Sequence, residues 1–102
     1  MVKLIDDKQN ELEELCRRFS VRTFEVFGSA AQESNFDETS DLDFLVQFLP
    51  MTPTEHSDAY FGLLNALKEL FGRAVDLLEV NAIKNPYLLE SVNQHRIQLY
   101  AA

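Results

Sequence analysis

Two short stretches of the sequence decide how the chain folds and where its chemistry lies. The first reads Phe27-Gly28-Ser29-Ala30-Ala31-Gln32-Glu33-Ser34, and the second, after a polar loop, reads Ser40-Asp41-Leu42-Asp43-Phe44-Leu45-Val46. Alternate side chains of a β-strand point to the same face, so Asp41 and Asp43 should point the same way from the start of one strand. Two close carboxylates repel each other unless a cation lies between them. The spacing therefore predicts a divalent metal site.

The Gly28-Ser29 pair follows a predicted strand over residues 22–27 and opens a short helix expected to extend to about Ser34. Glycine lets the backbone approach a phosphate without a side-chain clash. The segment Ser29-Ala30-Ala31-Gln32 fits a capping box, which makes Ser29 the expected N-cap. N–H groups at a helix start attract anions. We therefore expect Gly28 and Ser29 to bind phosphates that the metal links to the two aspartates; a role for Ser29 as a cap alone is the alternative.

The rest of the chain reads as alternating helices and strands. Helical or alternating spacing of apolar residues predicts a helix over 3–19, a strand over 41–48, a helix from Thr52-Pro53-Thr54-Glu55 to Gly72, a strand over 74–80, a helix from Asn85-Pro86 with Leu88, Leu89 and Val92 inward, and an extended tail from Arg96 to Tyr100. This order predicts an α/β fold, with one domain over residues 1–102 and a small mixed sheet of at least three strands flanked by helices.

Asp76 lies in the third predicted strand, which is otherwise apolar apart from Glu79 near its end. A lone buried carboxylate costs several kcal/mol unless it is paired or bound to a metal. If this strand lies beside the one that holds Asp43, three carboxylates converge at one end of the sheet and form the oxygen-rich site that suits Mg²⁺. Two metal ions about 4 Å apart could then clamp an in-line phosphoryl displacement. The alternatives are a satisfied buried acid at Asp76 and a solvated strand end at Asp41 and Asp43.

Composition narrows the possible partners. The chain has 102 residues and a net charge of −8, from 9 basic and 17 acidic residues. Such a surface repels nucleic acid and anionic lipid, although Mg²⁺ could screen the phosphates of a nucleoside triphosphate. The single cysteine, Cys16, excludes an intrachain disulfide and is expected to be buried. Because the sequence contains neither a signal-peptide core nor an apolar run of about 20 residues, we expect a cytoplasmic protein.

Taken together, these motifs resemble the nucleotidyltransferases of the DNA polymerase β superfamily, and most of all the minimal nucleotidyltransferases. The resemblance rests on Gly28-Ser29, on Asp41-Leu42-Asp43 with the apolar residues after it, and on Val75-Asp76-Leu77, and it covers nearly the whole chain. It implies a polymerase β-like fold, ATP as donor, Mg²⁺ as cofactor and transfer of a nucleoside monophosphate. Asp41 and Asp43 would hold the metal ions, Asp76 would assist one of them and could act as base, and Gly28 and Ser29 would hold the triphosphate.

Many minimal members of this superfamily resemble antitoxins that adenylylate a tyrosine of a small helical ribonuclease toxin, so an antitoxin role is the function that the resemblance implies. One departure stands out. The family usually has an arginine in the small-x-Arg-Gly segment after Gly-Ser, whereas here the positions read Ala31-Gln32-Glu33. The missing cation predicts slower catalysis. It also motivates the alternative of a binding module that neutralises its partner by contact. A third possibility, a domain without a ligand, requires the three acids to lie apart.

Overall fold

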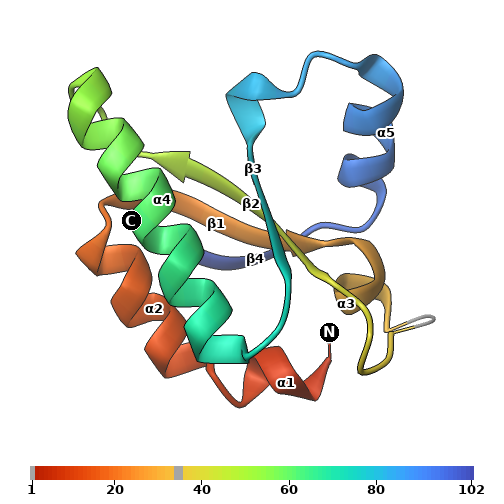
Figure 1. Ribbon diagram of the computed structural model, residues 1–102. Helices are drawn as coiled ribbons and strands as arrows, with labels where there is room; N and C mark the ends of the chain where they lie inside the picture. Colours follow the sequence, from red (N-terminus) through yellow and green to blue (C-terminus); the bar gives the residue numbers. More distant parts are fainter. Residues whose placement is uncertain (1, 34–35) are drawn as a thin grey trace.

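The computed structural model describes residues 2–33 and 36–102 (Figure 1). Its helices and strands, in chain order, are α1 (Lys3–Asp6), α2 (Gln9–Arg18), β1 (Val21–Phe27), α3 (Gly28–Gln32), β2 (Leu42–Phe48), α4 (Pro53–Phe71), β3 (Val75–Glu79), the 3-10 helix η1 (Val80–Ala82), α5 (Pro86–Gln94) and β4 (Ile97–Ala101). The predicted α/β fold is confirmed. The expected end of the short helix at Ser34 lies outside the described residues.

The four strands form one mixed sheet in the order β3-β2-β1-β4. β1 pairs antiparallel with β2 and with β4, whereas β2 and β3 are parallel and are joined by α4. Parallel neighbours need such a long crossover. The tail predicted as an extended segment is therefore a full edge strand, because its alternating residues pair with β1.

The main core lies between one face of the sheet and helices α2 and α4, which lie side by side in Figure 1. Phe44 is at its centre, with ring centroids 4.9 Å from Phe24 on β1 and 5.8 Å from Phe71 on α4. Fully buried side chains from the sheet and from α1, α2 and α4 belong to the same core, namely Ile5, Leu12, Val26, Leu42, Val46, Leu63 and Leu67. The expected burial of Cys16 is also confirmed.

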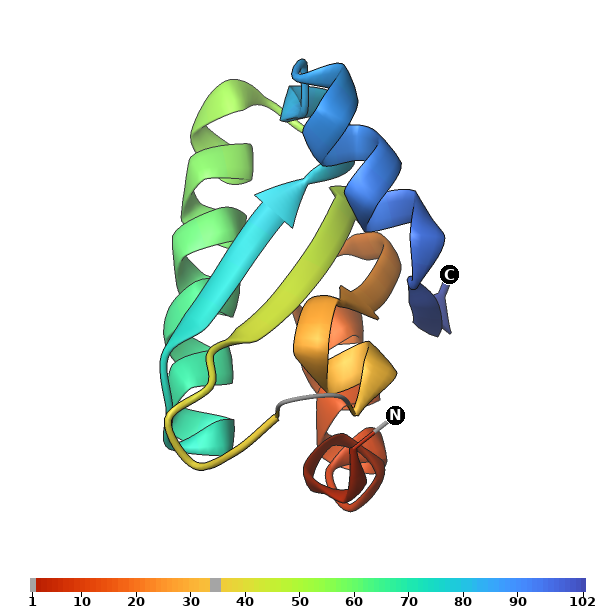
Figure 2. The ribbon, with the colours of Figure 1, turned by 90° about the vertical axis from the view of Figure 1, so that its right-hand side faces the viewer.

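The opposite face of the sheet is covered in part by α5, which begins near the end of β3 and runs past β2 toward β4 in Figure 2. Leu45 of β2 is 1% exposed and Val92 of α5 is 2% exposed, so the central strand is buried on both faces, as its sequence predicts. The prediction that Leu88 points inward is wrong, since 42% of this side chain is exposed. Leu88 and its neighbour Tyr87 belong to the first turn of α5 and are both exposed.

The single helix predicted over residues 3–19 is in fact two helices, because the chain turns at Asp7 and Lys8. The apolar spacing continues through the turn, with Ile5 and Leu12 both fully buried, which is why the sequence pattern alone shows no break. The turn directs α1 toward α3, where the Val2 N–H donates to the Ala30 carbonyl at 3.1 Å.

Local signals at the ends of the later helices are confirmed. Thr52 and Glu55 form a reciprocal capping box at the start of α4, and Gly72 ends this helix with a φ of 63°. The Asn85 side chain accepts hydrogen bonds from the first N–H groups of α5. In residues 2–33 and 36–102 we find no helix that combines the length and the apolar composition needed to span a bilayer.

The contribution of the capping box at the start of α4 to stability can be tested by mutation. Thr52→Ala removes the hydroxyl that accepts from the Glu55 N–H at 3.2 Å and should lower the free energy of unfolding by about 1 kcal/mol. Urea denaturation would measure the loss. Thr54→Ala, at an exposed position of the same turn, serves as the control. An equal loss in both variants would show that the cap contributes nothing specific.

Candidate functional site

Residues from three adjacent strands form one row across the sheet. Phe27 at the end of β1 is opposite Asp43 on β2, and Asp43 is opposite Asp76 on β3. Asp41 lies just before β2 and is exposed. The structure therefore places Asp43 and Asp76 at paired positions of neighbouring strands, as the sequence predicts. Asp41 lies two residues before Asp43, outside the strand. Since Phe44 is in the core, Asp43 points to the opposite face of the sheet.

The Gly28-Ser29 turn is part of the same site, because α3 begins where β1 ends, beside the start of β2 (Figure 2). A β-carbon added at Gly28 would overlap Oδ2 of Asp43 and lie 3.4 Å from its Cγ. Gly28 also has a φ of +70°, which residues with a side chain rarely adopt. Only glycine fits here without displacing the carboxylate.

The prediction that Ser29 is an N-cap is wrong. Helix α3 begins at Gly28, so the N-cap is Phe27, and no side chain caps this helix start. The reason is the left-handed turn at Gly28, which starts the helix two residues earlier than a cap at Ser29 would. Ser29 is partly buried in the first turn, and its carbonyl accepts from the Glu33 N–H at 2.8 Å.

The surroundings of the Asp43 carboxyl disfavour its ionised form. The pKa of the Asp43 carboxyl is raised from 3.8 to about 6, chiefly by burial and in addition by the carboxylates of Asp76 and Asp41 and by a hydrogen bond with Asp76. Desolvation and like charges both disfavour the ionised form. A cation between these carboxylates would relieve both costs.

The donor set fits a hard divalent cation, because Asp41, Asp43 and Asp76 offer only carboxylate oxygens, the ligands that Mg²⁺ prefers. In the described residues no three acidic, histidine or cysteine side chains form a complete metal cluster. The register of β2 and β3 pairs Asp43 with Asp76. The carboxylate of Asp41 is close enough to raise the pKa of Asp43.

Tyr60 of α4 supports β3 next to the site, although its sequence position indicates only packing. Its hydroxyl donates to the carbonyl of Leu77, the residue after Asp76, at 2.6 Å. Burial raises the pKa of the Tyr60 hydroxyl, and so do the charges of Glu79 and Asp76. The hydrogen bond fixes the backbone of β3 immediately beyond its carboxylate.

His56 of α4 belongs to a different region of the fold. Its ring pairs with Glu79 and lies 5.3 Å from the Phe48 ring. These residues line a hollow of about 360 Å³ at the far ends of β2 and β3. Asp43 and Asp76 are at the near ends of the same strands.

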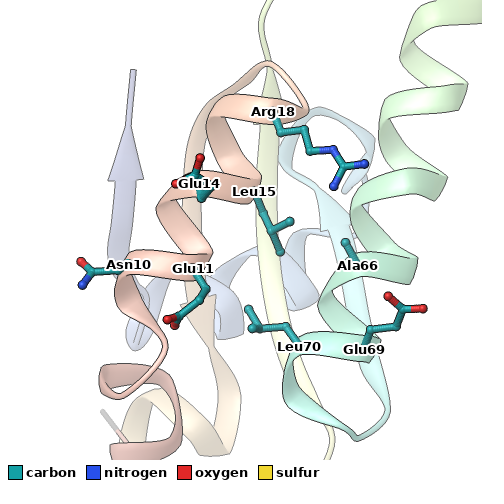
Figure 3. A pocket seen from close by; sticks show the side chains of 8 residues that line it. All are labelled: Asn10, Glu11, Glu14, Leu15, Arg18, Ala66, Glu69 and Leu70. Atoms are coloured by element: carbon teal, nitrogen blue, oxygen red, sulfur yellow. The ribbon is translucent and has the colours of Figure 1, made fainter.

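A groove of about 530 Å³ between α2 and α4 is also separate from the carboxylates (Figure 3). Leu15 and Leu70 point toward each other inside it, and charged side chains line its edges, namely Glu11, Glu14, Arg18 and Glu69. Both helices pack on the Phe44 face of the sheet, whereas Asp43 points to the other face. The groove is therefore no part of the site around Asp43.

The raised pKa of Asp43 predicts how stability depends on pH. Between pH 3.8 and about 6 the folded state binds more protons than the unfolded state, so the free energy of unfolding falls as pH rises through this window. At about 1.4 kcal/mol per pKa unit, the raised pKa corresponds to a fall of about 3 kcal/mol in the free energy of unfolding across this window. Because solvent reaches this side chain, we expect roughly 1 kcal/mol. Asp43→Asn should remove this loss, so the metal-free variant should be more stable than the wild type at pH 7 but not at pH 4.

Urea unfolding at both pH values measures this difference. Asp58→Asn controls for the loss of one negative charge, since Asp58 is exposed on α4 and lines a hollow with Leu49, beyond the far end of β2. A wild type whose stability relative to Asp43→Asn stays constant from pH 4 to pH 7 would contradict the raised pKa.

Two glycines allow the close approach at Gly28 to be tested apart from backbone strain. Gly28→Ala and Gly72→Ala both place a side chain at a positive φ, of +70° and +63°, and each should lower the free energy of unfolding by about 1–2 kcal/mol. At Gly72 the added β-carbon meets nothing within 4 Å, whereas at Gly28 it meets Asp43. We expect Mg²⁺ to raise the melting temperature of the wild type, and only Gly28→Ala should abolish this rise. Loss of that response in both variants would refute a specific role for Gly28.

Comparisons with known proteins identify relatives of the chain in sequence and in fold. Residues 9–99 match the family model described as "Nucleotidyltransferase domain". The "Putative protein adenylyltransferase MJ0128" of Methanocaldococcus jannaschii is 36% identical over 83 residues, which are 81% of this chain and 81% of that protein. The solved structure of a "putative minimal nucleotidyltransferase" is 31% identical, with a TM-score of 0.71, and the match covers 94% of this chain and 95% of that one.

A further solved structure, a toxin-antitoxin with AMP-PNP, has the same fold at 22% identity, with a TM-score of 0.69 over 92% of this chain and 73% of that one. With the family match over residues 9–99 and the two relatives above 30% identity, the chain belongs to the nucleotidyltransferase domain family.

Proposed function

We propose that this chain is a Mg²⁺-dependent adenylyltransferase that transfers AMP from ATP to a protein acceptor. The observation that carries the proposal is the row Phe27-Asp43-Asp76, which places two carboxylates beside the Gly28-Ser29 turn. Relatives named protein adenylyltransferases support AMP as the transferred group and a protein as the acceptor.

The roles of the chain's own residues follow from their positions. Asp41, Asp43 and Asp76 would hold Mg²⁺, which when bound would neutralise triphosphate charge during transfer. Gly28 leaves room for the backbone to approach the phosphates, and Ser29 offers its hydroxyl to them. The acceptor oxygen would form a bond to the α-phosphorus of ATP as the bond to pyrophosphate breaks, and Asp76 would accept the acceptor's proton.

We further propose that residues 1–102 act as one minimal nucleotidyltransferase domain, in the cytoplasm where ATP is available. The acceptor would be recognised through a surface of the partner protein. Structures of the same fold in toxin-antitoxin complexes support a small helical toxin as this partner and an antitoxin role for the chain.

A second candidate function, neutralisation of the partner by contact alone, is favoured by the segment after the turn. Ala31 is buried, Gln32 is exposed, and no arginine is available here to contact a triphosphate. Slow transfer, or none, is the consequence of this missing charge. The two candidates differ in whether protection requires the carboxylates.

Transfer of label from ATP tests the leading proposal. The chain is incubated with Mg²⁺, α-³²P-ATP and a candidate toxin, and label on the toxin is measured together with survival of cells that express both proteins. The double variant Asp41→Asn/Asp43→Asn should lower the rate by about 1000-fold, because the metal supplies several kcal/mol of charge stabilisation. Asp58→Asn, which alters a carboxylate outside the site, should transfer label at the wild-type rate.

Each candidate function has its own outcome in this experiment. Wild-type transfer that the double variant lacks, together with loss of protection, supports the enzyme. A double variant that protects cells as well as the wild type supports neutralisation by contact. Equal transfer by both proteins would rule out the carboxylates as the catalytic groups.

A further inference from the structure

We propose that Arg73 is a positioning residue that holds Asp41 in place for metal binding. This inference rests on the proposed function, because it takes Asp41 as a metal ligand. Arg73 lies outside every motif that the sequence singles out, between the end of α4 at Phe71 and the start of β3 at Val75.

The Arg73 side chain connects this position to the loop that leads into β2. Its Nη1 donates to two backbone carbonyls, those of Asp37 and Ser40, each at 3.0 Å. Its guanidinium carbon lies 4.8 Å from the centre of the Phe36 ring. One side chain therefore contacts three residues of the segment 36–40.

Asp41 needs such support because it lies before the first residue of β2 and is exposed. The carbonyl before it, from Ser40, accepts from Arg73. The N–H after it, from Leu42, donates to the Ala74 carbonyl at 3.1 Å. Consecutive residues of the α4–β3 connection thus fix the backbone on both sides of Asp41, and this connection leads directly to Asp76.

The loop has internal order of its own, which Arg73 anchors to the sheet. Asp37 Oδ1 accepts from the N–H of Thr39 at 2.8 Å and from its hydroxyl at 2.7 Å, and the Asp37 carbonyl accepts from the Ser40 N–H at 3.2 Å. These bonds shape the turn but do not tie it to another element. A planar guanidinium that donates in its plane and stacks on a ring is a role that lysine fills poorly.

Metal binding without turnover tests the proposal. Calorimetry measures the affinity for Mn²⁺ in the presence of a non-hydrolysable ATP analogue, and thermal melting reports folding. Residues that orient metal ligands typically contribute about 10- to 100-fold in affinity, so we expect Arg73→Met to weaken Mn²⁺ binding by that factor. Arg73→Lys, which keeps the charge, should fall between Arg73→Met and the wild type.

Arg18→Met is the matched control. Arg18 also stacks on a ring, with its guanidinium carbon 5.2 Å from the centre of Phe19, but it lies on α2, away from the carboxylates. The Arg18→Met variant should bind Mn²⁺ with the affinity of the wild type. In the background Asp41→Asn, Arg73→Met should cause no further loss of affinity, because both changes affect the same ligand.

The outcomes separate this proposal from the proposed function. Wild-type affinity for Mn²⁺ in Arg73→Met overturns the role of Arg73, even if the wild type transfers AMP. The same conclusion follows if Arg73→Met lowers the affinity by the same factor in the Asp41→Asn background as in the wild type. If Arg73→Met does not fold, wild-type affinity in Arg73→Lys overturns it. A wild type that binds Mn²⁺ but transfers no AMP overturns only the proposed function, and one that binds no Mn²⁺ overturns both.

Discussion

The pairing of β2 between β1 and β3 is the constraint on which the site depends. A shift of either pairing by one residue would turn Asp43 into the core and Phe44 out of it. The ring of Phe44, packed against Phe24 and Phe71, therefore fixes the register that places Asp43 beside Asp76. Core packing on one face of the sheet determines the arrangement of carboxylates on the other.

This arrangement has an energetic cost in the metal-free chain. Asp43 is partly buried among like charges, and its pKa is raised to about 6. The fold tolerates the cost because the neighbouring core is well packed and no buried side-chain polar atom of the described residues lacks a hydrogen-bond partner. Local conflicts of this kind are expected at functional sites, where ligand binding relieves them.

Much of the site could be predicted from sequence because its signals are local. A glycine-serine pair after a strand, two aspartates in alternation and a lone acid in an apolar strand each have a physical interpretation that needs no distant contact. The error at Ser29 also has a local cause: a serine followed three residues later by glutamine fits a cap, yet the left-handed Gly28 starts the helix earlier. Arg73 could not be found this way, because its partners lie more than thirty residues before it in the sequence.

The sequence by itself determined the alternation of the main helices with the first three strands, the ends of α4, and the residue types that a phosphate and a metal require, because periodicity and capping are properties of neighbouring residues. Only the tertiary structure decided that β3 pairs parallel with β2, that β4 pairs antiparallel with β1, that Asp43 lies against Gly28, and that Arg73 donates to the loop before Asp41. Such contacts join residues far apart in the chain, and packing of the whole sheet selects them.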